Sequence, residues 1–259
     1  MKIFIATFIM IFLVGCGGKI KPHPRNLECF NMAMNEIKKE GRPYPPLSKY
    51  GNALTVRPFW VGKYKFVFTE DEEPFFIMVQ EGSGYVYAGE KDIAFPGSDV
   101  SKRIPLDVLK EKYPDRFKRT LAEKAAYLVI QVRCEPKITI DPQWILQTPK
   151  EREESEGYRV KMTSAPITYP ELGLIGYPDY TNEKENNILW QSYYAVNNFR
   201  AIDGRPFRVI CAEVGGCQGT FVLKDGLVID YAYPIEYVAD WQDFYFFVLE
   251  YIVQHLQFS

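Results

Sequence analysis

Short runs of apolar residues alternate with polar positions along most of the chain, a pattern that predicts many β-strands. These runs are rich in aromatic and β-branched residues, and charged or glycine-containing turns separate them. The expected strands cover 53–56, 59–68, 74–80, 85–88, 158–168, 188–196, 207–213, 220–223 and 227–233. A polar segment at 177–187 is expected to be the loop between two of them.

Two other segments have apolar residues at helical spacing. The first covers 26–40, and Gly41 ends its apolar stripe. The second begins at Pro105, a residue type tolerated in the first turn of a helix, and is interrupted at Pro114. Its end at 127–132 is rich in β-branched residues and could form a strand instead.

A last helix is expected after Pro234. Between Phe244 and Val253 only Glu250 is polar, so apolar side chains surround almost the whole helix. This stretch is too short to cross a bilayer. Its composition favours burial against a sheet, and the alternative is an apolar surface offered to a partner.

Residues 104–129 and 233–256 share a pattern, because each begins hydrophobic-Pro-hydrophobic-acid and follows several strands. The similarity predicts an α+β fold with two similar lobes, each a small, mainly antiparallel sheet packed against a helix. The first lobe would cover 26–147 and the second 158–259. The charged segment 148–157 is expected to be the linker between them.

Residues 1–15 begin with one Lys near the start and continue as an apolar segment too short to span a bilayer, as in a secretory signal peptide. The segment ends in Leu-Val-Gly before Cys16, and this order resembles the lipobox of bacterial lipoproteins. The resemblance implies that Cys16 becomes the first residue and carries a lipid anchor, with residues 16–25 as a tether. Gly17 resembles the pattern of lipoproteins sent to the outer membrane, which implies a location on its periplasmic side.

The 259 residues include 31 basic and 33 acidic ones, a formal net charge of −2. This balance gives no reason to expect nucleic acid or anionic lipid as a partner, because both require a concentrated basic face. Aromatic residues are numerous, with 18 Tyr, 18 Phe and 4 Trp. They fit aromatic-rich strands, and the alternative is a surface that binds sugar or protein.

Besides Cys16 the chain has Cys29, Cys134, Cys211 and Cys217, an even set that fits two disulfides in an oxidising compartment. Three pairings are possible. Cys211 and Cys217 flank Ala-Glu-Val-Gly-Gly, whose glycines can form a tight reversal. This favours a Cys211–Cys217 disulfide and leaves Cys29 and Cys134 as the second pair.

Motifs for catalysis and metal binding are weak. His23 and His255 are the only histidines and no Cys-x-x-Cys pair is present, so neither a metal site nor a cofactor is expected. Ser83 lies between glycines, but Glu81 stands where the first glycine of a G-x-S-x-G elbow belongs. A Ser83–His255 pair is the remaining option for a nucleophile and its base.

Paired carboxylates of a glycosidase can come from distant parts of a chain, so this class of enzyme stays open. The acidic residues that lie near aromatic ones are Glu171, Asp179 and Glu213. Acids near aromatic residues are also common on ordinary protein surfaces. No catalytic residue is therefore assigned, and we expect a protein that is not an enzyme.

The end of the chain carries a second resemblance. Cys211 and Cys217 precede a glycine-turned hairpin and a helix with Asp240-Trp241-Gln242. With the lipobox, this segment resembles periplasmic immunity lipoproteins that protect bacteria against lipase effectors of type VI secretion. The resemblance implies a protein that binds a toxin and inhibits it, without naming the contact residues. The alternative is a cell-envelope enzyme or an assembly lipoprotein that acts on or binds peptidoglycan or sugar.

Overall fold

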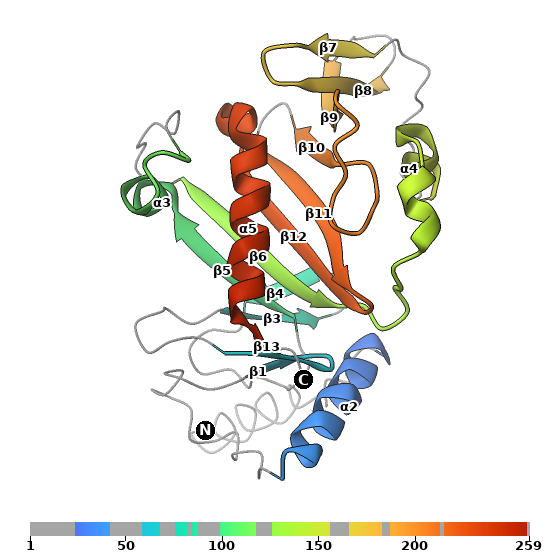
Figure 1. The fold of residues 1–259 in the computed structure, drawn as a ribbon, viewed down its shortest axis with the longest axis vertical. Coiled ribbons are helices and arrows are strands. Elements are labelled where there is room, and N and C mark those ends of the chain that lie inside the picture. Colours follow the sequence, from blue (N-terminus) through green and yellow to red (C-terminus); the bar gives the residue numbers. More distant parts are fainter. Residues whose placement is uncertain are drawn as a thin grey trace, which may run out of the picture.

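The computed structural model of the chain describes residues 24–41, 59–67, 76–81, 84–87, 99–117, 126–155, 166–182, 187–212 and 215–257. Several features expected from the sequence lie outside these ranges. They are the signal peptide, Cys16, the tether up to His23, the expected strand at 53–56, residues 158–165 of the expected strand at 158–168, Ser83 and Glu213. The described residues form helices and antiparallel strands, which confirms the α+β class (Figure 1).

Ten of the described strands form one antiparallel sheet, in the order β4-β3-β5-β6-β12-β11-β10-β9-β8-β7 (Figure 1). Their bounds are β3 Phe76–Glu81, β4 Gly84–Tyr87, β5 Val100–Pro105, β6 Tyr127–Cys134, β7 Ile167–Tyr169, β8 Leu174–Asn182, β9 Asn187–Ala195, β10 Arg208–Ala212, β11 Gly216–Lys224 and β12 Leu227–Pro234. A second, three-stranded sheet contains β1 Phe59–Val61, β2 Tyr64–Phe66 and β13 Leu256–Gln257.

The described helices are α2 Pro24–Lys39, α3 Leu106–Lys112, α4 Pro149–Ser155 and α5 Trp241–His255, with the 3-10 helices η2 Pro142–Leu146 and η3 Ile235–Asp240. The last two residues of the expected tether already belong to α2, because proline suits the first turn of a helix. The segment after Ala126 is the strand β6, the alternative that its β-branched residues indicated. None of the described helices is both long and apolar enough to cross a membrane.

The expected arrangement of two lobes is not confirmed. β6 comes from the expected first lobe and β12 from the second, yet they pair from Leu227↔Cys134 to Ala232↔Val129. One sheet therefore continues across both halves of the chain. The pairing removes two exposed strand edges that separate small sheets would each have presented to solvent.

Two polar segments are more ordered than their sequences indicate. The expected linker at 148–157 contains the helix α4. The expected loop at 177–187 is shorter than predicted, because β8 continues to Asn182 and pairs with β9 up to Asn187. Register shifts within this pair let the strands continue although the polar residues do not alternate with apolar ones.

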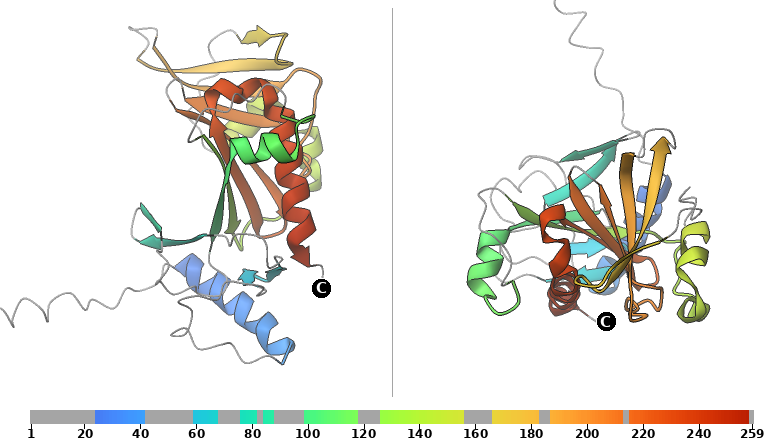
Figure 2. Two further views of the ribbon diagram at one scale, coloured as in Figure 1. Left: turned by 90° about the vertical axis from the view of Figure 1, so that its left-hand side faces the viewer. Right: turned by 90° about the horizontal axis from the view of Figure 1, so that it is seen from above.

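The main core lies between the sheet and α5, which crosses one face of it (Figure 2). The ring of Phe221 in β11 lies 5.4 Å from that of Tyr245 in α5, and Tyr233 in β12 stacks 4.2 Å from Phe244. Every second residue of β6 is buried, as the alternation of the sequence requires. One face of the last helix is thus buried against the sheet, whereas Phe246 and Val253 on its other face are 40% and 38% exposed.

Candidate functional site

The helix α4 begins with a capping box, in which Thr148 and Glu151 bond to each other. The Glu151 side chain accepts hydrogen bonds from the Thr148 backbone N–H at 2.7 Å and from its hydroxyl at 2.8 Å. These bonds hold the pKa of Glu151 below its ordinary value. Pro149 takes the first helical position, where the lack of an N–H costs nothing. The bonds between Thr148 and Glu151, together with Pro149, therefore start a helix in a segment that has no apolar stripe.

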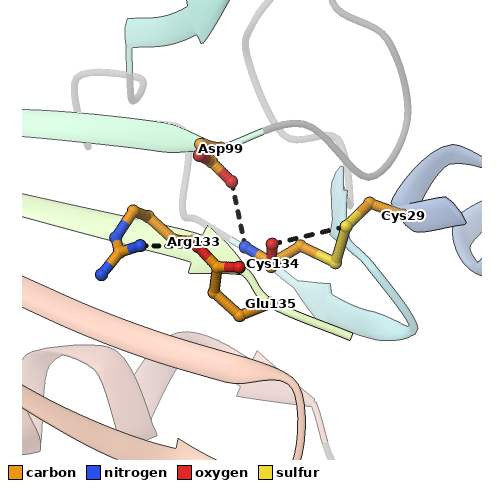
Figure 3. Close-up of a disulfide and its surroundings, with 5 residues drawn as sticks. All are labelled: Cys29, Asp99, Arg133, Cys134 and Glu135. Atoms are coloured by element: carbon orange, nitrogen blue, oxygen red, sulfur yellow. Dashed lines mark hydrogen bonds and ion pairs between the residues drawn. A yellow bond between two sulfur atoms is a disulfide. The ribbon is translucent and has the colours of Figure 1, made fainter. Parts of the chain in front are cut away.

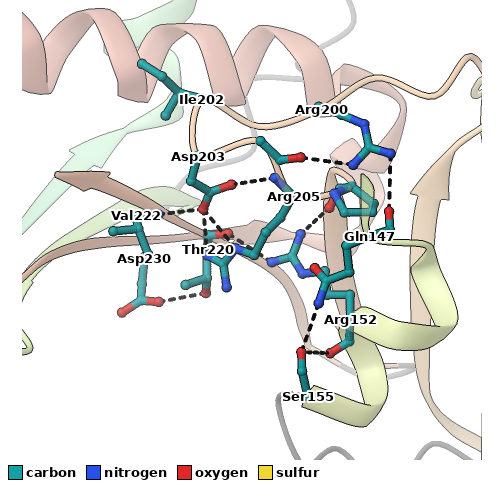
Figure 4. A network of polar contacts seen from close by, with 12 residues as sticks. Gln147, Arg152, Ser155, Arg200, Ile202, Asp203, Arg205, Thr220, Val222 and Asp230 are labelled. Carbon is teal, nitrogen blue, oxygen red and sulfur yellow. Dashed lines mark hydrogen bonds and ion pairs between the residues drawn. The ribbon is translucent and has the colours of Figure 1, made fainter. Parts of the chain in front are cut away.

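Arg152 attaches α4 to the sheet (Figure 4). The side chain is almost fully buried, and its guanidinium donates to the backbone oxygens of Pro206 and Thr220. Pro206 belongs to the segment before β10 and Thr220 lies in β11, so one side chain connects the helix both to this segment and to a strand of the sheet. Bonds from a charged donor are stronger than bonds between neutral groups, which favours this docking.

Glu153 is the second buried charge of α4. Its carboxylate accepts from the Tyr194 hydroxyl at 2.5 Å and from the Arg208 guanidinium at 3.0 Å. Burial and the nearby carboxylate raise the pKa of Tyr194 well above its ordinary value, so its hydroxyl remains a donor. Together Arg152 and Glu153 fix the orientation of α4, and with it the position of the segment that precedes the helix.

That segment is the 3-10 helix η2, which Arg200 holds in place. The guanidinium of Arg200 donates to the backbone oxygens of Trp144 at 3.1 Å, Gln147 at 3.2 Å and Gly204 at 2.9 Å. Figure 4 shows Arg200 beside Gln147 at this junction. A single planar side chain thus satisfies carbonyl groups at the end of η2 and in the loop opposite.

The loop opposite η2 joins β9 to β10, and the buried carboxylate of Asp203 stabilises it. Asp203 is buried and accepts from the backbone N–H groups of Arg205 at 3.0 Å and Val222 at 2.8 Å. The Arg205 guanidinium pairs with the same carboxylate at 2.7 Å. It also lies over the ring of Trp144 in η2, 4.7 Å from the ring centroid. The Asp203–Arg205 pair therefore orders the loop, and the contact of Arg205 with Trp144 packs the loop against η2.

The loop also contacts α5. Gly204 has a φ of +84°, and a side chain at this position would meet the backbone of Ile145, so the loop and η2 approach closely. On the other side, the Ile202 N–H donates to the Tyr245 hydroxyl at 2.8 Å. The order in space is therefore η2, then the loop, then α5.

Apolar side chains project from all three segments. Leu146 is 78% exposed, Ile145 60%, Ile202 51% and Phe246 40%. We call these four residues the apolar platform. Exposed apolar residues are normal when scattered, and contiguous patches are typical of interaction surfaces. Because the four residues stand on adjoining segments, they are a candidate for such a surface. The buried charges described above hold the platform in shape.

The structure contains both cysteine pairs that the sequence favours. Cys29 in α2 is joined to Cys134 at the end of β6, and Cys211 in β10 to Cys217, its direct neighbour in β11. Figure 3 shows the first pair, where Asp99 also accepts from the Cys134 N–H at 3.0 Å. Two disulfides fit an extracytoplasmic protein.

Three residues considered for catalysis are described, and each lies in a different place. Glu171 is exposed between β7 and β8, whereas Asp179 lies in β8 opposite Trp190. His255 is buried at the end of α5, with its Nδ1 2.5 Å from the backbone oxygen of Tyr251. Within the described ranges, no group of three or more His, Cys, Asp or Glu residues could hold a metal ion.

Comparison with known proteins gives one distant likeness. No family model matches the chain. No curated protein matches it either. Among solved structures, it is similar to an immunity protein of the Stenotrophomonas maltophilia type IV secretion system. The identity is 14% and the TM-score 0.44, over 79% of this chain and 94% of the other. So low a score supports no transfer of function.

Neither the platform nor the role of the residues that support it was predicted from the sequence. The capping box of Thr148 and Glu151 was a readable signal for a helix start, and it would have placed α4 correctly. The sequence contains no such signal for the bonds of Arg200 and Asp203, because their partners Trp144 and Val222 lie far away in the sequence.

Proposed function

We propose that this protein is an immunity lipoprotein of the periplasm that binds an antibacterial, lipase-type effector of type VI secretion and blocks it. In this proposal a lipid on Cys16 anchors the protein in the outer membrane, and the protein acts by binding alone. The observation that carries the proposal is the apolar platform on η2, the loop before β10 and α5.

The platform combines two properties that an inhibitor needs. A partner that removes its apolar side chains from water stabilises the complex by about 25 cal/mol per Å² of apolar surface buried. Its backbone is already fixed by Arg200 and Asp203, so little conformational entropy is lost on binding. Leu146 has the largest exposed fraction of the four, so a partner can remove most of its side chain from water.

The direct test is protection of cells against the effector. If the adjacent gene encodes a phospholipase-like protein, this effector is expressed in the periplasm of a test bacterium. Growth is then compared between cells that also express the present protein and cells that do not. We expect the wild type to restore growth and Leu146→Asp to abolish protection, because a carboxylate would have to be buried at the contact. Val108→Asp is the matched control, since Val108 is 46% exposed on α3, away from the platform.

Two results would contradict the proposal. One is failure of the purified protein to bind the effector together with measurable hydrolysis of muropeptides by the protein itself. The other is full protection by a folded Leu146→Asp variant, which would remove the platform from the contact surface. Circular dichroism and the thermal midpoint verify that each variant is folded.

The anchor is tested separately. Cys16→Ser should leave the domain folded and release it from membranes, because a single thiol carries the lipid in this proposal. Labelling cells with palmitate and fractionating them measures both effects. A wild-type protein that takes up no label and remains in the cytosol would refute the anchor.

A further inference from the structure

The helix α2 contacts the rest of the molecule through one face. Cys29, Ala33 and Ile37 are buried at every fourth position, so they form a stripe along the helix. Among the described residues of α2, Cys29 is the one that belongs to the main core. Ala33 and Ile37 instead form a small cluster of their own with Trp60 of β1, which lies beside α2 in Figure 1. The two ends of the stripe are therefore held in different ways.

A covalent bond fixes the Cys29 end of the stripe. The disulfide joins Cys29 to Cys134, the last residue of β6, and the two side chains are 2% and 0% exposed. The β1–β2 turn lies against this bond, because a side chain at Gly62 would come 2.8 Å from the Sγ of Cys134. The disulfide thus joins α2 to the large sheet at a point where the small sheet also packs (Figure 3).

The other end of the stripe is held by weaker contacts. The cluster around Trp60 contains three buried residues. Just after the helix, Glu40 pairs with Lys65 at 2.8 Å, and their side chains are 31% and 18% exposed. Ion pairs that are open to solvent contribute little to stability. The disulfide is therefore the strongest of these attachments.

The helix α2 has little stability of its own. It has 16 residues, close to the length of about 12–15 residues below which an isolated helix is marginal in water. Its first turn contains no acidic residue that would complement the helix dipole. We therefore expect α2 to remain helical only while it is docked, and docking depends most on the bond at Cys29.

We propose that the Cys29–Cys134 disulfide is a redox latch, a bond whose formation docks α2. When the two thiols are reduced, α2 leaves its site and unfolds, while the large sheet stays folded because its core with α5 contains no other described residue of α2. Oxidation takes two electrons and two protons from the thiols and forms the S–S bond. A small disulfide in the surroundings accepts them and becomes two thiols. A chain that passes from a reducing to an oxidising compartment would thus complete its N-terminal part only after the transfer.

Hydrogen exchange of the full mature protein, resolved by peptide with mass spectrometry, tests the latch. In Cys29→Ser/Cys134→Ser we expect the amides of α2 to exchange at least about tenfold faster than in the oxidised wild type, as in a locally unfolded segment. The amides of β11 and β12 should stay protected at short labelling times, because both strands lie inside the sheet. Cys211→Ser/Cys217→Ser is the matched control, since it removes the other disulfide and should leave α2 protected.

A second measurement uses the wild type itself. Purified in dithiothreitol, it should show the same fast exchange in α2, and oxidised glutathione should restore slow exchange. Slow exchange of α2 in the reduced wild type or in Cys29→Ser/Cys134→Ser overturns the proposal, and so does fast exchange that oxidation does not reverse. The same loss of α2 protection in the control also overturns it. So does equal loss of protection in α2 and the sheet, or a failure of Cys29→Ser/Cys134→Ser to fold, because the bond would then support the whole fold.

Discussion

Gly219 of β11 lies directly opposite Tyr231 of β12, and the tyrosine ring fills the space where a side chain at Gly219 would be. The ring is fully buried under α5, so it has little room to move. Gly219→Ala should therefore destabilise the protein by about 1–3 kcal/mol, the usual cost of overpacking a core. Urea denaturation followed by fluorescence measures the change.

A double-mutant cycle identifies the cause of this effect. Tyr231→Leu shortens the side chain, so Gly219→Ala should cost less in that background than in the wild type. If the two substitutions change the free energy of unfolding additively, the alanine at position 219 does not contact the ring of Tyr231.

The ion pair of Glu153 and Arg208 leads to a second prediction. Their side chains are 1% and 4% exposed, and Glu153→Ala removes the carboxylate that Arg208 contacts. A buried charge that loses its partner typically costs about 3–5 kcal/mol in the free energy of unfolding. The neighbouring Glu154→Ala is the control, since Glu154 is 65% exposed and should change stability by no more than about 0.5 kcal/mol. If Glu153→Ala and Glu154→Ala lower the free energy of unfolding equally in chemical denaturation, the ion pair has no structural role.

The two disulfides should differ in their contribution to stability. Cys29 and Cys134 are 105 positions apart, whereas Cys211 and Cys217 are 6 apart. Loop-closure entropy predicts a loss of about 4–5 kcal/mol when the first is replaced by two serines, and about 2 kcal/mol for the second. Thermal and urea unfolding of the two double variants test this order, and the reverse order would show that chain entropy is not the main term.

Buried tyrosines predict a loss of stability in alkali. Burial raises the pKa of Tyr193 and that of Tyr245 to about 12. The unfolded chain releases these protons near pH 10, whereas the folded chain keeps them until about pH 12. The contribution of the two tyrosines to the free energy of unfolding should therefore be constant below about pH 9, and the free energy should fall as the pH rises from about 10 to 12. Urea unfolding across this range should show a shallower fall for Tyr193→Phe, and an unchanged slope would contradict the assignment.

Local features of the fold were readable from the sequence. The apolar pattern predicted the strand β12, and the β-branched residues at 127–132 indicated β6 as an alternative to a helix. The apolar composition of the last helix indicated that part of it is buried. The glycines between Cys211 and Cys217 indicated their pairing. Each of these signals lies within a few residues of the feature that it predicts, so no knowledge of distant partners was needed.

Features that depend on distant partners were not readable. The strand order joins β6 to β12 through hydrogen bonds between backbone groups, which carry no sequence signature. The buried charges of α4 looked like the charges of a solvated linker, because burial of Arg152 depends on carbonyl groups more than fifty positions away. Leu146 was overlooked for the same reason, since the loop that supports η2 belongs to another part of the chain.

The disulfide between Cys29 and Cys134 also determines how the molecule would carry a mechanical load. Cys29 lies within two turns of the start of α2, and Cys134 ends a strand that is flanked on both sides by β5 and β12. A pull on the chain before α2 therefore reaches the interior of the large sheet through a covalent bond. An edge strand can be peeled off one hydrogen bond at a time, whereas β6 would have to shear against two neighbours at once. The fold is thus built to resist tension applied from its N-terminal side.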